Sequence, residues 1–347
     1  MVASTPVPLR LNRALQHPFR IRPASAPTMT SSRRRTALPA LLLLLAAACA
    51  IHATGHAAET PRTRVAGVAQ AIEDHYFDAD RGRTIADGLR AAAADGAFDA
   101  LAAPQALAHA LTTRLKPLDR HFHVRVAQSA ETRERRAPRP DMGDGIERVE
   151  ILPGNIGVLG LRGFADFDFG RSDAPARQAI DAALQRLAQT DAMVVDLRGN
   201  RGGSPAMVGY LASAFVAPGA DIFNTFHSRA GTQSEAPAQW HPAPRTQLPL
   251  YVVIDGDTGS AAESFAYTLQ QAGRATIVGE TSGGAANPGG PITTREGLDV
   301  FVPTGSPVNP FSHRNWEGVG VQPDVPAAPD KALDVALERA RRAVPRD

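Results

Sequence analysis

Ser260 is the residue of this chain whose type and position best suit a nucleophile. It lies in the segment Asp257–Glu263 (DTGSAAE), after the apolar run 250–254 and before a helix-forming stretch at 261–272. A hydroxyl at the start of a helix faces unpaired backbone N–H groups and positive potential, which would stabilise an oxyanion that forms beside it. Glu263 also follows Ser260 at the S-x-x-E spacing of a capping box. Taken alone, this segment favours the helix cap.

A glycine-rich segment is the second place where the chain could contact a ligand. Residues 196–205 (DLRGNRGGSP) follow the buried strand expected at 192–197 and precede another helix. Closely spaced glycines allow a backbone to approach a ligand and to turn its N–H groups toward it. The segment lacks the Lys-Ser/Thr pair of a phosphate-binding loop and the glycine spacing of a dinucleotide site. Taken alone, it is typical of a tight strand-to-helix turn.

Together, the two segments resemble the tail-specific protease superfamily. That family carries a D-L-R-x-N-x-G-G turn followed by a T-x-S-A-A/S-E turn that holds the nucleophile, and both occur here in this order. The resemblance extends to residues 273–281 (GRATIVGET) and covers roughly residues 62–327. It implies an α/β fold, namely a ClpP/crotonase-like core of β-β-α units preceded by a helical N-terminal subdomain. It also implies a serine peptidase that acts through an acyl-enzyme on Ser260.

The base that would activate Ser260 separates the branches of this superfamily. In the C-terminal processing branch a lysine about 25 residues after the serine acts as base, but this chain has Ala285 there. Its only lysines, Lys116 and Lys331, lie on no expected core strand near the serine. A neutral serine needs a base, and near neutral pH that base is usually histidine. The chain also has no insertion large enough for the PDZ domain of the processing branch, so we expect none.

His121 is the histidine that the resemblance singles out. Residues 119–122 (DRHF) resemble the D-x-H-L turn of the branch that includes the interphotoreceptor retinoid-binding proteins. In that branch, and in the tricorn core protease, this histidine is the base. Two alternatives stay open: His123 would project to the same side of an extended segment and suggests a two-histidine metal site, or His121 is an ordinary polar residue. Because no carboxylate has a matching spacing, we expect no metal and no cofactor.

Glu317 is the residue that would orient the imidazole. Residues 315–324 (NWEGVGVQPD) resemble the N-W-E-G-x-G-V-x-P-D stretch of the same branch, and tricorn has a catalytic glutamate at the corresponding position. An acid in this role stabilises the imidazolium that forms during acyl transfer. In tricorn a serine precedes the histidine, whereas Arg120 precedes it here, so the fourth member of the relay is missing. The alternative is a surface acid on a glycine-rich turn.

The resemblance thus implies acyl transfer to Ser260 with His121 as base. The N–H groups of Ala261 and of Gly202 or Gly203 would hold the oxyanion, and each such donor contributes about 3–4 kcal/mol to transition-state stabilisation. A binding protein for an apolar ligand on the same scaffold is the main alternative, since a fold does not determine a function. A crotonase-type acyl-CoA enzyme explains neither the helix-opening serine nor the distant histidine. An α/β-hydrolase is disfavoured because no G-x-S-x-G motif spans Ser260.

Residues 1–58 have the composition of a leader with a signal peptide. They hold seven arginines and no acidic residue, and the Arg33–Arg35 cluster precedes an apolar stretch at 37–50. We therefore expect an exported protein, periplasmic or secreted. Cys49, the only cysteine, ends a weak lipoprotein pattern (AAAC), so membrane attachment is expected only if it is lipidated. Without the leader the chain carries 30 basic and 35 acidic residues, a net charge of −5 that suggests no nucleic-acid partner.

The rest of the chain divides into three parts. Apolar residues at helical spacing, with alanines between them, predict a helical subdomain over 59–128. Residues 129–145 are rich in Arg, Glu, Pro and Gly, which indicates a linker. Strands and helices then alternate over 146–347, which predicts a catalytic domain with a parallel or mixed sheet covered by helices. The expected partner is a peptide or protein substrate.

Overall fold

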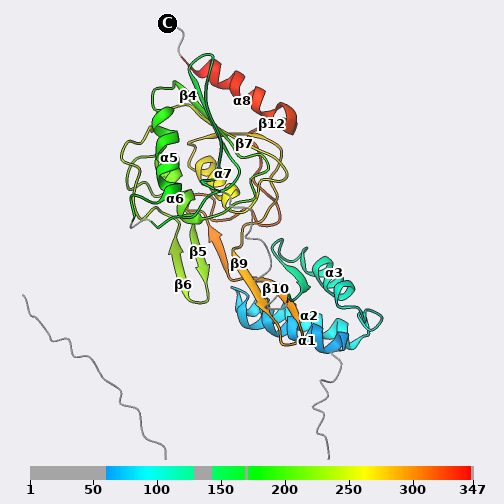
Figure 1. Ribbon diagram of the computed structural model, residues 1–347. Helices are drawn as coiled ribbons and strands as arrows, with labels where there is room; N and C mark the ends of the chain where they lie inside the picture. The colour runs from blue at the N-terminus through cyan, green and yellow to red at the C-terminus, as the bar shows by residue number, and fades with distance from the viewer. Residues whose placement is uncertain (1–59, 129–142, 169–170, 345–347) are drawn as a thin grey trace, which may run out of the picture. The chain divides into compact units, whose positions relative to one another are not determined.

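A computed structural model of the protein describes residues 60–128, 143–168 and 171–344 (Figure 1). The leader and signal peptide expected at 1–58, including Cys49, lie outside these residues, as does most of the expected linker. None of the described helices has both the length and the apolar character needed to cross a membrane.

Helices begin and end the described chain, and strands and helices alternate between them (Figure 1). The helices are α1 (Pro61–His75), α2 (Ala79–Ala94), α3 (Pro104–Leu115), α5 (Pro175–Arg186), α6 (Pro205–Ser213), α7 (Ala261–Gln271) and α8 (Pro329–Ala343). The strands are β1 (His123–Val126), β2 (Ile146–Leu152), β3 (Ile156–Leu161), β4 (Ala192–Asp196), β5 (Thr225–Ser228), β6 (Gly231–Ser234), β7 (Leu250–Ile254), β8 (Thr276–Gly279), β9 (Gly289–Thr293), β10 (Leu298–Pro303), β11 (Gly305–Val308) and β12 (Val325–Pro326).

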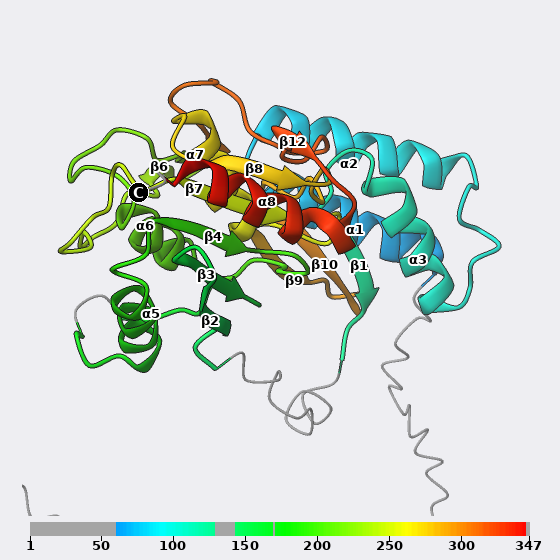
Figure 2. The same ribbon diagram turned by 90° about the horizontal axis from the view of Figure 1, so that it is seen from above.

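The core is built on a six-stranded sheet with the order β12-β8-β7-β4-β3-β2. Neighbouring strands are parallel except β2 and β3, which form the expected antiparallel hairpin. Side chains of β4 alternate: Met193 and Val195 pack with α5, α6 and α7, whereas Val194 packs with α8 on the opposite face. Figure 2 shows α8 lying over the strands of this sheet. Strands covered on both faces are apolar throughout, which is why this sequence shows continuous apolar runs. The expected α/β class with a mixed sheet is confirmed.

A smaller antiparallel sheet, β1-β10-β9, packs against α1, α2 and α3 (Figure 1). Its central strand β10 buries Leu298, Val300 and Val302 among the apolar side chains of these helices. In β1, Val124 joins the same cluster, while His123 pairs in register with Phe301 of β10. β1, which follows the turn that contains His121, is therefore held by the helices and by β10.

A third sheet, β11-β5-β6, includes the hairpin formed by β5 and β6. Arg229 lies in the turn of this hairpin, and its guanidinium donates to the carbonyl oxygens of Tyr76 and Glu73 over 2.7 and 2.6 Å. These carbonyls belong to the C-terminal end of α1, where a cation is favoured by the helix dipole. The hairpin is therefore joined to the helices that precede His121.

Candidate active site

Ser260 ends the loop after β7 and caps helix α7. Its backbone has φ +55° and ψ −121°, whereas an ordinary capping residue lies in the extended region with negative φ. Such a conformation costs a non-glycine residue about 1–3 kcal/mol and is found most often at functional sites. The N–H of Ser260 donates to Oε2 of Glu263 over 2.7 Å, which is the Glu263 half of the expected capping box. Ser260 therefore caps the helix in a strained conformation that ordinary capping does not require.

Glu263 holds this strained turn in place. Its buried carboxylate accepts the N–H of Ser260, the hydroxyl of Ser282 over 2.6 Å, and the N–H groups of Gly284 and Ala285 over 2.6 and 2.9 Å. Burial raises the pKa of Glu263, while these hydrogen bonds act in the opposite direction. The position where the processing branch has a lysine thus contributes only a backbone donor here.

The glycine-rich loop lies directly against Ser260. A Cβ atom on Gly202, whose φ is +106°, would lie 2.8 Å from Cβ of Ser260 and 2.9 Å from the backbone nitrogen of Ala261. Asn200 is fully buried in this loop, and its backbone carbonyl accepts a hydrogen bond from the N–H of Gly259 over 2.9 Å. Because β4 and β7 are parallel neighbours, the loops that follow them meet at one edge of the sheet. The two sequence motifs are therefore adjacent in space.

The expected oxyanion donors differ in their surroundings. Gly203 and Ala261 line the same cavity as Ser260. The N–H of Gly202 instead donates to Oδ1 of Asn200 over 2.9 Å. Between the two glycines, the geometry favours Gly203 as the partner of Ala261.

His121 shares a cavity with Ser260. It lies in the turn before β1 and lines, with Ser260, a cavity of about 210 Å³ whose walls include Gly203, Ala261 and Phe301. The ring of Phe301 stacks on the imidazole, with 5.8 Å between the ring centroids. The structure thus brings into one cavity a serine from the loop after β7 and a histidine from the turn before β1, which are distant in the sequence.

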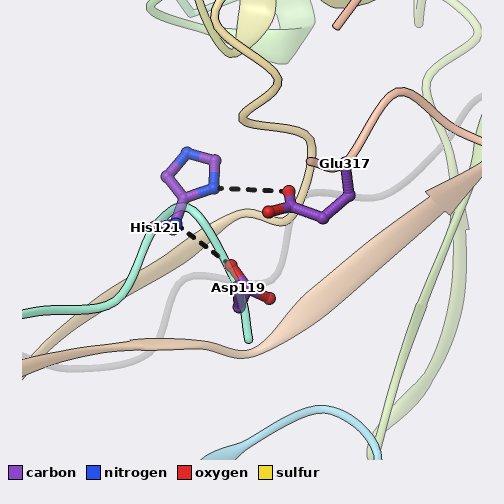
Figure 3. Close-up of side chains that lie close together, drawn as sticks. All are labelled: Asp119, His121 and Glu317. Atoms are coloured by element: carbon purple, nitrogen blue, oxygen red, sulfur yellow. Dashed lines mark hydrogen bonds and ion pairs between the residues drawn. The ribbon is translucent and has the colours of Figure 1, made fainter. Parts of the chain in front are cut away.

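Glu317 lies beside the imidazole, in the segment before β12. Its Oε2 is 3.9 Å from Nδ1 of His121 (Figure 3). That Nδ1 is buried and has no hydrogen-bond partner among the described residues. Three backbone N–H groups orient the carboxylate: Arg120 donates to Oε1 over 2.7 Å, and Ala286 and Asn287 donate to Oε2 over 2.7 and 3.1 Å. Arg120, which takes the place of the serine in tricorn, therefore contributes through its backbone.

Asp119 joins this cluster, although its sequence position suggested no role of its own (Figure 3). Its Oδ1 accepts the N–H of His121 over 3.1 Å, and its Oδ2 accepts the hydroxyl of Tyr76 over 3.1 Å and Nδ2 of Asn287 over 2.8 Å. Burial, together with the negative charge of Glu317, raises the pKa of Asp119 to about 6. The signal that points to it is its place in the DRHF turn, two residues before the imidazole.

The protonation state of His121 suits a general base. Burial lowers the pKa of its imidazole, and the charge of Asp119 acts in the opposite direction without reversing the shift. The imidazole is therefore neutral at neutral pH, which is the form that accepts a proton.

The residues that could bind a metal ion differ from the two histidines considered in the sequence analysis. In the described part of the chain, ligand atoms of Asp119, His121 and Glu317 all lie within 4.8 Å of one another. His123 is not in this group; it lines a neighbouring cavity of about 180 Å³ together with His121. The oxygens of both carboxylates already accept N–H or O–H donors. These hydrogen bonds suit a cluster that orients an imidazole better than a metal centre.

Comparisons with known proteins point to a peptidase family. A family profile described as Peptidase family S41 matches residues 155–327. The chain is 30% identical over 198 residues to carboxyl-terminal-processing peptidase 1, chloroplastic, of Arabidopsis thaliana, which is 56% of this chain and 37% of that protein. It is 31% identical over 153 residues to a carboxyl-terminal-processing protease of Synechocystis, which is 44% of this chain and 35% of that protein. The chain thus spans little more than a third of the length of these curated relatives.

A solved structure shares the fold. The structure of a lipoprotein from Streptococcus agalactiae superimposes with a TM-score of 0.52 at 15% identity, over 82% of this chain and 97% of that one. At this identity the likeness concerns the fold alone.

Proposed function

The chain belongs to peptidase family S41, whose profile matches residues 155–327, and we propose that it is a serine peptidase with Ser260 as nucleophile and His121 as base. One observation carries the proposal: both side chains line a single cavity that also includes Gly203 and Ala261. The strained backbone of Ser260 supports it, because a cap alone does not call for positive φ. The family implies that the substrate is a peptide or protein.

The proposed reaction is acyl transfer. Nε2 of His121 removes the hydroxyl proton of Ser260 as Oγ attacks the carbonyl carbon of the substrate, and the N–H groups of Gly203 and Ala261 stabilise the oxyanion. The intermediate then collapses: the C–N bond breaks, and the imidazolium returns its proton to the leaving amine. Water, activated in turn by His121, hydrolyses the ester on Ser260 and restores both groups.

Glu317 would stabilise the imidazolium at Nδ1. The carboxylate faces the buried Nδ1 across 3.9 Å, so Nε2 is the nitrogen left to serve Ser260. Catalytic hydrogen bonds in unliganded sites are often long and shorten when substrate binds. The proposal therefore includes a closer approach of Glu317 and His121 in the substrate complex.

A lysine base finds no support in the positions of the two lysines. Lys116 lies at the C-terminal end of α3 and Lys331 lies on α8. Neither lines the cavity that contains Ser260. The proposed base thus differs from the lysine of the processing branch.

An activity-based probe tests this proposal directly. A fluorophosphonate should label the wild-type protein at Ser260, and Ser260→Ala should abolish labelling. His121→Ala should slow labelling on the order of 10²–10⁴-fold, the contribution typical of a general base. His123→Ala is the matched control: it removes a nearby exposed histidine outside the Asp119–His121–Glu317 cluster and should label like the wild type.

Two outcomes would overturn the proposal. Equal labelling of His121→Ala and the wild type would remove His121 from the mechanism. A folded wild-type protein that is not labelled, yet binds a retinoid or fatty acid tightly, would favour the apolar-ligand alternative.

We further propose that the protein is exported, on the basis of the leader expected at 1–58. Fractionation of cells that produce the full chain should place it outside the cytoplasm, and mass spectrometry of the mature N-terminus should show cleavage near Ala57. Incorporation of labelled palmitate that is lost in Cys49→Ala would show lipid anchoring instead. A full-length chain in the cytoplasmic fraction would overturn the export proposal.

A further inference from the structure

Glu235 is a buried carboxyl in the wall of the cavity that contains Ser260. It follows strand β6 and is only 5% exposed, yet it lines both this cavity and a larger one beside it. Burial raises the pKa of Glu235 to about 7, and hydrogen bonds from Ser264 and Asn224 act in the opposite direction. A buried carboxyl is costly unless it is well paired, so the function of this one calls for an explanation.

Two polar side chains contact the Glu235 carboxyl and do not use all of its acceptor positions. The hydroxyl of Ser264 lies 2.8 and 2.7 Å from the two carboxyl oxygens, and Nδ2 of Asn224 donates to Oε2 over 2.9 Å. A hydroxyl has one proton, so within the described residues these contacts supply two side-chain donors to a group that can accept about four hydrogen bonds. The carboxylate therefore retains acceptor capacity for a ligand.

The backbone of Glu235 is fixed in this place. Its N–H donates to the carbonyl of Asn224 over 2.9 Å. Its own carbonyl passes so close to α6 that a Cβ atom on Gly209 would lie 2.3 Å from the oxygen. The segment after β6 thus crosses α6 where only glycine fits, and the carboxyl is held toward α7.

The position of Glu235 relative to the nucleophile follows from α7. Ser264 lies one helical turn after Ser260 on this helix, lines the same cavity and contacts the carboxyl directly. The cavity at Ser260 measures about 210 Å³ and the larger one about 500 Å³; their linings share Pro205, Phe226, Glu235 and Pro288, so they adjoin. The carboxyl is therefore part of the wall where the two cavities meet, close to the nucleophile.

The linings of these two cavities include one acidic side chain and no lysine or arginine in the described chain. That acidic side chain is Glu235. The shared walls are otherwise apolar, formed by Pro205, Phe226 and Pro288. An apolar pocket with a single acidic end fits a side chain with an aliphatic stem and a cationic tip.

We propose that Glu235 determines substrate specificity by binding the side chain of a lysine or arginine next to the peptide bond that Ser260 attacks; this inference rests on the proposed peptidase function. The methylene stem lies along Pro205, Phe226 and Pro288. The ammonium or guanidinium donates to the remaining acceptor positions of the carboxylate and stabilises its ionised form, which burial alone disfavours.

The test compares two peptides that differ at one residue. Mass spectrometry of a digested peptide library first locates the cleaved bonds, and lysine or norleucine is then placed on either side of such a bond. Norleucine keeps the aliphatic stem and lacks the charge. We expect the wild type to favour lysine in kcat/KM by roughly 10- to 100-fold, as for a hydrogen bond to a charged group, and Glu235→Gln to bring this ratio near one.

The ratio separates specificity from a structural role of Glu235. Glu235→Gln has nearly the same volume and can still bond to Ser264, and a ratio of kcat/KM values is unchanged when part of the protein is unfolded. Glu338→Gln on α8 is the matched control, because its side chain is 59% exposed and no residue of α8 lines either cavity. It should retain the wild-type preference for lysine.

A binding experiment distinguishes failure of this inference from failure of the proposed function. With Ser260→Ala protein, calorimetry should show tighter binding of the lysine peptide than of the norleucine peptide, and Glu235→Gln added to it should remove the difference. Absence of hydrolysis with the binding preference intact would refute the peptidase and support the Glu235 site. Cleavage with equal efficiency, or a preference for norleucine, would refute the role of Glu235 and leave the peptidase standing.

Discussion

The two halves of the candidate site are built in different ways. Ser260 lies where a strand of the central sheet meets helix α7, and buried groups on either side of it, Asn200 and Glu263, hold its loops through hydrogen bonds within that core. His121 lies in the turn that leads into β1 of the smaller sheet, and its surroundings come from segments far apart in the sequence. Its neighbour Asp119 bonds to Tyr76 of the helical part and to Asn287 near β9.

This difference indicates which half is preformed. The Ser260 turn is fixed in a strained conformation, whereas Nδ1 of His121 is still 3.9 Å from Glu317, roughly 1 Å longer than a hydrogen bond. The smaller sheet and the central sheet carry separate apolar clusters. A small movement between them would therefore shift His121 without disturbing Ser260.

The largest loss of activity is expected when Ser260, in the preformed part of the site, is replaced. Ser260→Ala removes the proposed nucleophile and should lower kcat/KM on the order of 10⁴–10⁶-fold, because the remaining groups only bind and polarise the substrate. The thermal unfolding midpoint should change little, since the backbone bond to Glu263 is kept. Retention of more than a few per cent of the activity in a purified, sequence-verified variant would show that another residue is the nucleophile.

Glu317→Gln changes the part of the candidate site that contains His121, the proposed base. An amide can donate to Nδ1 of His121 and so favour the tautomer with a proton on Nε2, which cannot accept the serine proton. We expect kcat/KM to fall roughly 10²- to 10⁴-fold with a smaller change in KM, measured by steady-state kinetics. Glu150→Gln, an exposed acid on β2, is the control. Equal kinetics of the two variants would assign Glu317 to the surface-acid alternative.

The same contrast explains how far the sequence could be interpreted. The α/β class follows from apolar runs on strands with two covered faces, and the neighbourhood of Gly202 and Ser260 follows from two motifs that each end a strand. The N–H of Gly202 donates a hydrogen bond to Oδ1 of Asn200, a contact that no motif spacing predicts. The role of Asp119 depends on a partner 168 residues later, Asn287, and such pairing appears only when the chain has folded. The catalytic assignments themselves remain predictions.

Glycine substitutions test how closely the glycine-rich loop packs against Ser260, without changing the surroundings of His121. A Cβ at Gly202 would meet Cβ of Ser260 at 2.8 Å, whereas a Cβ at Gly199 meets nothing within 4 Å. Both glycines have positive φ, +69° at Gly199 and +106° at Gly202. Alanine therefore carries a backbone cost of about 1–2 kcal/mol at Gly199 and a larger one at Gly202, whose φ lies beyond the left-handed region. We expect Gly202→Ala to lower kcat/KM by at least about tenfold more than Gly199→Ala, since a misplaced nucleophile is costly. Urea unfolding checks stability, and equal kinetics would contradict close packing of the loop on Ser260.

The smallest effect concerns the pH dependence of the half that contains His121. Asp119 has a pKa of about 6 in the folded chain, above the ordinary carboxyl value of about 3.9. The folded state therefore keeps a proton that the unfolded chain releases between about pH 4 and 6. The contribution of this group to stability is complete below pH 4 and is lost as the pH rises through 6.

Asp119→Asn removes this titration while an amide oxygen can still accept the N–H of His121. The free energy of unfolding of the variant, relative to the wild type, should thus increase steadily from pH 4 to pH 7, as measured by urea unfolding at several pH values. Asp221→Asn, at an exposed position, should give a difference that does not vary with pH. A pH-independent difference for Asp119→Asn would mean that this carboxyl is ionised throughout the range, and that the cluster around His121 is more open to solvent than its burial indicates.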